Sequence, residues 1–132
     1  MTDPNTPDWK DKLILVVEDN YSNYRLLELA LRKTNAKLHW AKNGQEAISL
    51  CREVQDIDLI LMDIQMPVMD GYETTAQVKI LRPEIPIVAQ TSYSMTGDRE
   101  KSIEAGCIDH IPKPIIISDL ITILAKYISR ND

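Results

Sequence analysis

The sequence predicts an α/β fold, a doubly wound five-stranded parallel sheet with five helices. Short apolar runs alternate five times along the chain with stretches whose apolar residues recur at helical spacing. Two of these runs, Leu13–Val17 and residues 58–62, are strongly apolar, which is typical of strands covered on both faces. Because the connections are only a few residues long, the alternation favours parallel strands with helices on both sides of the sheet.

Each expected element follows from a local pattern. Strands are expected at residues 13–17, 37–41, 58–62, 86–90 and 108–111. Helices are expected to about residue 33, over the apolar stripe at 47–54, at 72–81, up to about 105, and from a capping Ser118 onward. Asn20 or Ser22 is a typical N-cap for the first helix, and Gly106 suits the C-terminus of the fourth. Pro112 and Pro114 favour an edge position for the last strand.

Composition limits the classes of function. The 132 residues suffice for one domain. A net charge of −5 disfavours binding to a nucleic-acid backbone. The apolar runs are too short to span a membrane, and the polar N-terminus does not resemble a signal peptide. We therefore expect a cytoplasmic domain at 12–132, preceded by a tail or linker at 1–11, with no contact to nucleic acid or membrane. Trp9 is the tail residue expected to pack on the domain.

Polar side chains gather where the expected strands end. Glu18 and Asp19 follow the first strand, Asp63 the third, Thr91 the fourth, and Lys113 comes after the fifth. In an open α/β sheet, ligands bind beyond the carboxyl ends of the strands. A single Asp at a strand end is usually a cap or turn residue, but acids, a hydroxyl and an amine at four strand ends indicate one shared site.

If the first and third strands are neighbours, Glu18, Asp19 and Asp63 share one strongly acidic pocket. Two carboxylates about 5 Å apart repel by roughly 3 kcal/mol at an effective dielectric constant near 20. Three carboxylates therefore require cations, and Lys113 supplies only one positive charge. A divalent ion with oxygen ligands is expected to supply the rest, and Mg²⁺ is the preferred candidate.

Four segments carry a family resemblance. They are Val17–Asn20, Leu61–Gly71, Ala89–Ser92 and Gly106–Pro114. In order and spacing they resemble the receiver domain of two-component response regulators, over about residues 12 to 130. The Leu61–Gly71 string also resembles receivers attached to hybrid histidine kinases. The resemblance implies the flavodoxin-like strand order 2-1-3-4-5.

The resemblance also implies roles for the site residues. Asp63 would accept a phosphoryl group from a phosphohistidine on a histidine kinase or histidine phosphotransfer protein, at the exposed end of its strand. Asp19, Asp63 and the main-chain carbonyl of Gln65 would bind Mg²⁺, and Glu18 would assist through water. Lys113 and Thr91 would contact phosphoryl oxygens. A cis bond is expected before Pro114.

Signalling in this family uses a switch. The resemblance implies that phosphorylation would draw Thr91 inward and that an aromatic ring on the last strand would fill the vacated space. In this sequence His110 occupies that position instead of Tyr or Phe, so the switch would be weaker or pH-sensitive; an exposed His110 without a switching role is the alternative. The fourth helix, fifth strand and fifth helix would form the partner face and a possible weak homodimer contact.

Other functions remain open at this stage. The domain could be a degenerate receiver that docks without phosphorylation, although all five site residues are present. A phosphatase with an Asp nucleophile usually needs an acid two residues later, where this chain has Gln65. A flavin-binding module would need a phosphate-binding loop after the first strand, where Glu18 and Asp19 would repel phosphate. The sequence is compatible with a single-domain regulator and with a segment of a larger kinase.

Overall fold

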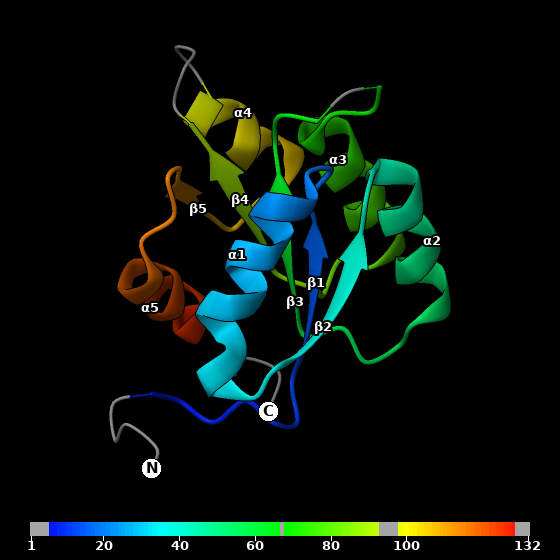
Figure 1. Cartoon of the computed structure of the whole chain (residues 1–132). Helices are drawn as coiled ribbons and strands as arrows, with labels where there is room; N and C mark the ends of the chain where they lie inside the picture. The colour runs from blue at the N-terminus through cyan, green and yellow to red at the C-terminus, as the bar shows by residue number, and fades with distance from the viewer. Residues whose placement is uncertain (1–5, 67, 93–97, 129–132) are drawn as a thin grey trace.

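The chain folds into a five-stranded parallel sheet between two layers of helices (Figure 1). The computed structural model describes residues 6–66, 68–92 and 98–128. The strands are β1 (Leu13–Val17), β2 (Lys37–Ala41), β3 (Leu59–Asp63), β4 (Ile87–Thr91) and β5 (Asp109–Pro112). Their order across the sheet is β2-β1-β3-β4-β5, which confirms the predicted topology and the edge position of the last strand.

Helices connect the strands and cover both faces of the sheet. They are α1 (Tyr21–Leu31), a short 3₁₀ helix η1 (Arg32–Thr34), α2 (Gly44–Glu53), α3 (Gly71–Leu81), α4 (Asp98–Ala105) and α5 (Ile117–Tyr127). Figure 1 shows α1 and α5 on one face, and α2 and α3 on the other with α4 beside α3. Within the described part of the chain, no helix is both long and apolar enough to cross a membrane.

The central strands are buried on both faces, as their continuous apolar sequences predict. Alternate residues of a strand point to opposite faces. Ile14 and Val16 accordingly pack in the core that contains residues of α1 and α5. Leu15 and Val17 pack in the second core, with residues of α2 and α3. Trp9 is only 5% exposed and joins the first core, which confirms that this part of the tail packs on the domain.

The helix starts agree with the sequence prediction at α1 and differ at α5. The Asn20 side chain accepts a hydrogen bond from the backbone N–H of Asn23 at 3.0 Å, which is N-cap geometry. Ser118 was the predicted cap of the last helix, and this prediction is wrong. The extended residue before α5 is Ile116, and it makes no side-chain cap bond. Ser118 lies inside the first turn, one position beyond the first helical residue, so its side chain is too far along the helix to cap it.

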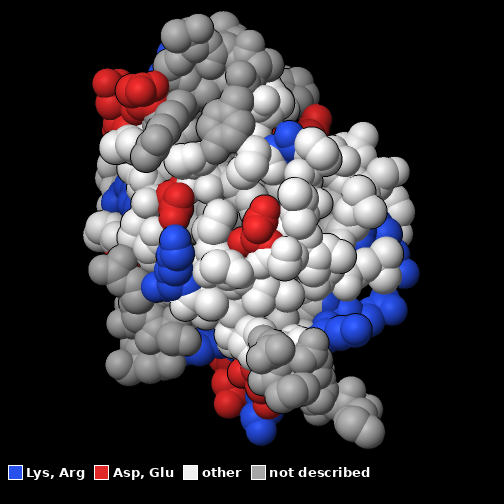
Figure 2. Space-filling view, turned by 90° about the vertical axis from the view of Figure 1, so that its left-hand side faces the viewer, with Lys and Arg blue, Asp and Glu red and all other residues white. Residues whose placement is uncertain are grey.

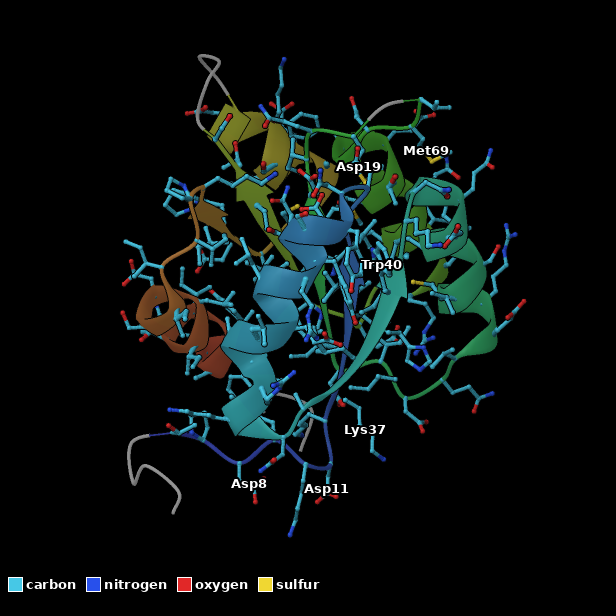
Figure 3. The ribbon with its side chains drawn as sticks, viewed as in Figure 1. Asp8, Asp11, Asp19, Lys37, Trp40 and Met69 are labelled. Atoms are coloured by element: carbon cyan, nitrogen blue, oxygen red, sulfur yellow. The ribbon has the colours of Figure 1, made fainter. Side chains whose placement is uncertain are left out.

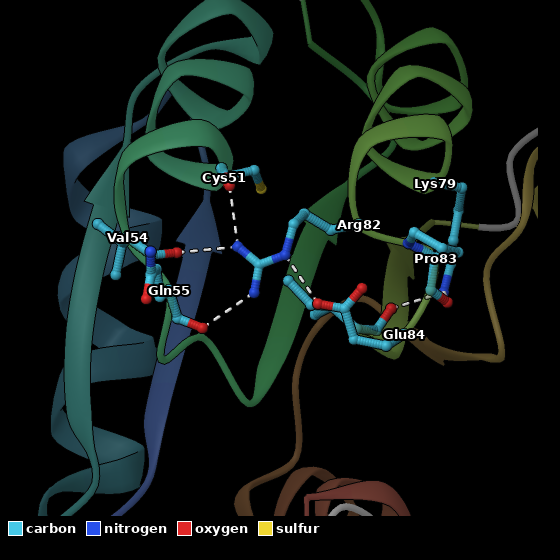
Figure 4. A network of polar contacts seen from close by, with 8 residues as sticks. Cys51, Val54, Gln55, Lys79, Arg82, Pro83 and Glu84 are labelled. Atoms are coloured by element: carbon cyan, nitrogen blue, oxygen red, sulfur yellow. Dashed lines mark hydrogen bonds and ion pairs between the residues drawn. The ribbon is translucent and has the colours of Figure 1, made fainter.

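A single arginine ties the end of α2 to the connection between α3 and β4 (Figure 4). The Arg82 guanidinium donates to the backbone carbonyls of Cys51, Val54 and Gln55, each at 2.9 Å. It also pairs with Glu84 at 2.7 Å. Because the last carbonyls of a helix have no partner within it, Arg82 acts as a C-terminal cap supplied by a neighbouring element.

Candidate phosphoacceptor site

The five predicted site residues lie at the carboxyl ends of the strands. Glu18 and Asp19 follow β1, Asp63 is the last residue of β3, Thr91 the last of β4, and Lys113 follows β5. Figure 3 shows Asp19 at the upper edge of the sheet, where the parallel strands end. The fold therefore brings together residues that are up to 95 positions apart in the sequence, from Glu18 to Lys113.

Three carboxylates form a compact cluster. One oxygen from each of Glu18, Asp19 and Asp63 lies within 4.8 Å of the others. Glu18 is 0% exposed and Asp63 is 1% exposed, whereas Asp19 is exposed. Carboxylate oxygens at this separation are the ligand type that Mg²⁺ prefers, so the residues present fit a divalent cation.

The buried side chain of Glu18 supports the same assignment. Its Oε2 accepts a long hydrogen bond from the backbone N–H of Asn20 at 3.3 Å, while Oε1 is buried without a hydrogen-bond partner. Burial, followed by the proximity of Asp63, raises the pKa of Glu18 from 4.5 to about 8. A buried acceptor without a partner is costly, and a cation in the cluster would remove that cost.

Asp63 is held by two donors on one oxygen. The Lys113 ammonium lies 2.9 Å from Oδ1, and the backbone N–H of Gln65 donates to the same oxygen at 3.0 Å. The backbone N–H of Lys113 donates to the carbonyl of Thr91 at 2.8 Å, which anchors the lysine beside β4. The Lys113–Pro114 peptide bond is cis. Asp63 is thus positioned and paired with a cation.

The structure corrects one expectation about Asp63. The strand ends at the edge of the sheet as predicted, but the Asp63 side chain is only 2% exposed rather than open to solvent. Lys113 and the backbone of Gln65 contact Oδ1, and Glu18 and Asp19 each have a carboxylate oxygen within 4.8 Å of an Asp63 oxygen. The Asp63 carboxylate is therefore almost entirely enclosed by its neighbours.

Two loops meet above the end of the sheet. The Gln65 side-chain amide donates to the Ser92 hydroxyl at 2.9 Å, which joins the chain after β3 to the chain after β4. Gly71 packs beneath this region, and a Cβ there would lie 2.3 Å from the backbone oxygen of Asp63. Only glycine allows α3 to start this close to the end of β3. Pro67, part of the predicted motif, is outside the described residues.

His110 lies in β5, the edge strand that pairs with β4. Its side chain is 20% exposed, and its Nδ1 is 3.8 Å from the Asp109 carboxylate. Asp109 also accepts a hydrogen bond from the Tyr127 hydroxyl at 2.7 Å. Tyr127 and Ile123 are partly buried and pack against the core. The residue at the expected switch position is therefore partly buried, close to α5.

A cavity of about 250 Å³ opens beside the acidic cluster. Glu18 and Lys113 line it at the site, and Leu27 and Ile115 line it further out. Its rim includes Leu26, which is 65% exposed, and Ile117, which is 55% exposed. The cavity thus continues from the acidic cluster to an apolar surface on α1 and the start of α5.

Sequence reasoning missed Trp40 as a neighbour of the site. Its indole N–H donates to the backbone carbonyl of Glu18 at 2.7 Å. A large aromatic residue near the end of the strand adjacent to β1 was the available signal, because neighbouring parallel strands end at the same edge of the sheet.

The two cysteines take no part in this site. Cys51 and Cys107 are buried and free, and burial raises the pKa of each thiol to about 11. Thiols with such pKa values are largely un-ionised near neutral pH and hence weak nucleophiles.

Known proteins share both the sequence pattern and the fold. Residues 14–125 match the family model for the response regulator receiver domain. Over 120 residues the chain is 38% identical to the polar-differentiation response regulator DivK of Brucella anthropi, covering 89% of this chain and 96% of DivK. It is 37% identical over 130 residues to hybrid signal transduction histidine kinase I of Dictyostelium discoideum, covering 89% of this chain but only 8% of the kinase.

Two solved structures resemble the fold closely. The receiver domain of sensor histidine kinase PA1611 from Pseudomonas aeruginosa, which has magnesium in its active-site cleft, superposes with a TM-score of 0.81 at 35% identity, covering 89% of this chain and 97% of that one. The receiver domain of Saccharomyces cerevisiae Ssk1, in complex with the histidine phosphotransfer signalling protein Ypd1, has a TM-score of 0.81 at 30% identity, covering 92% and 90%.

Proposed function

Because this chain belongs to the response regulator receiver family of two-component phosphorelays, we propose that Asp63 is its phosphoacceptor. The observation that carries the proposal is the pairing of Asp63 with Lys113 at 2.9 Å inside a cluster of three carboxylates. Asp63 Oδ would attack phosphorus, the bond from phosphorus to the donor histidine nitrogen would break, and that nitrogen would keep the electron pair. The domain would contribute to its own phosphorylation as a signalling module, by positioning and charge.

Asp19 and Asp63 would hold Mg²⁺ together with the backbone carbonyl of Gln65, and Glu18 would assist through water. Support comes from the spacing of the three carboxylates and from the partnerless Oε1 of Glu18. The bound ion would neutralise charge on the incoming phosphoryl oxygens. The chain's own contribution is to keep the acids fixed at the ends of rigid strands.

Lys113 and Thr91 would receive the transferred group. The Lys113 ammonium contacts Asp63 Oδ1, so it would turn toward an oxygen of the incoming phosphoryl group as the donor arrives. Thr91 is buried at the end of β4, where its hydroxyl could donate to a second oxygen. The displacement of Lys113 would also uncover Asp63 for the donor.

Thr91 and His110 would pass the signal to the surface. An inward shift of Thr91 would make room for the partly buried His110 ring, which the contact with Asp109 connects to α5 through Tyr127. Figure 2 shows the side of the molecule that lies at the left of Figure 1, which carries β5 and α5, and much of its centre is uncharged. We place the output contact and a weak homodimer contact on the α4–β5–α5 face, where Ile103 and Ile108 are exposed.

The phosphodonor would dock on α1 and the start of α5. The supporting feature is the cavity that leads from Glu18 and Lys113 to exposed Leu26 and Ile117. A histidine kinase or histidine phosphotransfer protein that buries this apolar rim would bring its phosphohistidine to the mouth of the site. The complex of the Ssk1 receiver with Ypd1 is consistent with a partner of this kind.

The direct test is mass spectrometry after incubation with acetyl phosphate and Mg²⁺. We expect the wild-type protein to gain the mass of one phosphoryl group and Asp63→Asn to gain none. Asp56→Asn, which changes an exposed acid close to β3 in the sequence, is the matched control and should react as the wild type does. An unmodified wild-type protein would favour a docking module without phosphorylation, and a modified Asp63→Asn would place the acceptor elsewhere.

A further inference from the structure

Trp40 is the large aromatic residue of the edge strand β2, and its indole reaches the acidic site. The strand β1 pairs with β2 as far as Val17 and Ala41. Beyond that pair, the backbone N–H of Glu18 donates to the Ala41 carbonyl at 3.0 Å. The Glu18 carbonyl accepts from Trp40 Nε1 at 2.7 Å. Both backbone groups of Glu18 are therefore held by β2, one by its backbone and one by a side chain.

The orientation of the indole is itself fixed. The Trp40 ring stacks on Tyr24 of α1, with centroids 4.5 Å apart and an interplanar angle of 9°. Tyr21 lies at 5.6 Å in a tilted arrangement, and the Lys42 ammonium is 5.2 Å from the ring centroid. Figure 3 shows Trp40 on β2, between Asp19 at the carboxyl ends of the strands and Lys37 at the start of β2. Stacking on a helix restricts the ring plane, so the N–H remains directed at Glu18.

This hydrogen bond acts at the point where the chain leaves the sheet. Glu18 is 0% exposed, so water has little access to its carbonyl if the indole N–H is removed. A buried carbonyl without a donor is destabilising, so the backbone would shift to find another partner. Glu18 and Asp19 would move with it, and these carry two of the three clustered carboxylates.

We infer that Trp40 is a positioning residue of the metal site, which sets Mg²⁺ affinity by fixing the backbone of Glu18. This inference rests on the proposed Mg²⁺ site at Asp19 and Asp63. Partners that orient metal ligands typically change metal affinity by about 10–100-fold when they are removed. Because Trp40 acts on the backbone rather than on a ligand atom, we expect the lower end of this range.

The test is a Mg²⁺ titration of the full chain by calorimetry, with Trp40→Phe compared with the wild type. Phenylalanine retains an aromatic ring against Tyr24 and removes the donor. We expect the Mg²⁺ dissociation constant to rise about tenfold. Trp9→Phe is the control, because it changes the other tryptophan, which lies in the core on the α1 and α5 face. It should lower the melting temperature without changing Mg²⁺ affinity.

A second measurement separates positioning from general destabilisation. The rate of phosphorylation by acetyl phosphate is measured against Mg²⁺ concentration. Trp40→Phe should need about tenfold more Mg²⁺ for half its maximal rate, and should reach the wild-type rate at saturation. If Trp40→Phe does not fold, the same measurements are made on Trp9→Phe protein that carries benzothienylalanine at position 40. This side chain keeps the bicyclic ring and replaces the N–H by sulfur.

The outcomes are distinguishable. The inference is overturned if Trp40→Phe binds Mg²⁺ as tightly as the wild type, or if the benzothienyl protein binds it as tightly as Trp9→Phe. Either result leaves the proposed function intact. A wild-type protein that binds no Mg²⁺ overturns the metal site of the proposed function and, with it, this inference. A lower affinity in Trp9→Phe equal to that in Trp40→Phe would show that loss of stability alone weakens the site, and would also overturn it.

Discussion

Replacing Glu18 by glutamine tests whether the metal-free site holds a proton. Burial, and next the neighbouring Asp63, raise the pKa of Glu18 from 4.5 to about 8. Between these two values the folded protein keeps a proton that the unfolded chain has released. The metal-free wild-type protein should therefore lose stability as the pH rises through this window. Glu18→Gln cannot titrate and should not lose this contribution.

The size of the effect follows from the same pKa values. A change of one in pKa corresponds to about 1.4 kcal/mol, so the interval from 4.5 to about 8 sets an upper limit of about 5 kcal/mol. Rearrangement around the ionised carboxylate and entry of water reduce this limit. We expect a measured difference of about 2–3 kcal/mol between the two proteins across the window.

The assay is urea denaturation followed by circular dichroism, in the presence of a chelator, at about pH 5 and about pH 9. The free energy of unfolding of the wild type should fall relative to that of Glu18→Gln. Saturating Mg²⁺ should abolish the difference, because a bound cation favours the ionised carboxylate. Glu53→Gln, at an exposed position of α2, should parallel the wild type. Parallel curves for wild type and Glu18→Gln without metal would refute the reasoning.

Three further substitutions probe other features. Arg82→Met removes three hydrogen bonds to carbonyls at the end of α2, each worth about 1 kcal/mol. Thermal unfolding should show a fall of about 10 °C, and exposed Arg52→Met almost none. Val68 is fully exposed with φ of 70°; because asparagine adopts this conformation more readily, Val68→Asn should raise stability by about 1 kcal/mol, and a lower melting temperature would contradict this. His110→Tyr should preserve the NMR shift changes in β5 that acetyl phosphate causes; their loss would exclude a ring switch.

The strands and the composition of the site could be predicted because they depend on local patterns. The runs at β1 and β3 are apolar enough to require burial on both faces, and parallel strands bring their carboxyl ends to one edge. Sequence order therefore places Glu18, Asp19 and Asp63 at one edge of the sheet, and the strand order implied by the family resemblance puts β1 beside β3, which brings the three acids together.

Contacts made by long side chains could not be predicted in this way. Arg82 reads as part of a helix break, yet its guanidinium reaches carbonyls 27 to 31 positions away. The sequence indicates only that Trp40 is one residue of a short strand, yet its indole N–H donates to the backbone carbonyl of Glu18, at the end of the neighbouring strand. Such contacts depend on the exact register of β1 and β2 and on the distance between helices, which local spacing does not contain. The burial of Asp63 depends on the same arrangement.

The packing of Trp9 has a consequence for attachment to other domains. Its backbone N–H donates to the Thr34 carbonyl, and the backbone N–H of Lys12 donates to the Trp9 carbonyl. These bonds fix the chain just before β1, at the amino ends of the strands. Figure 1 shows α5 finishing toward this same end of the molecule. A module fused through either route would lie at the amino ends of the strands, opposite the end of the sheet that carries Asp63.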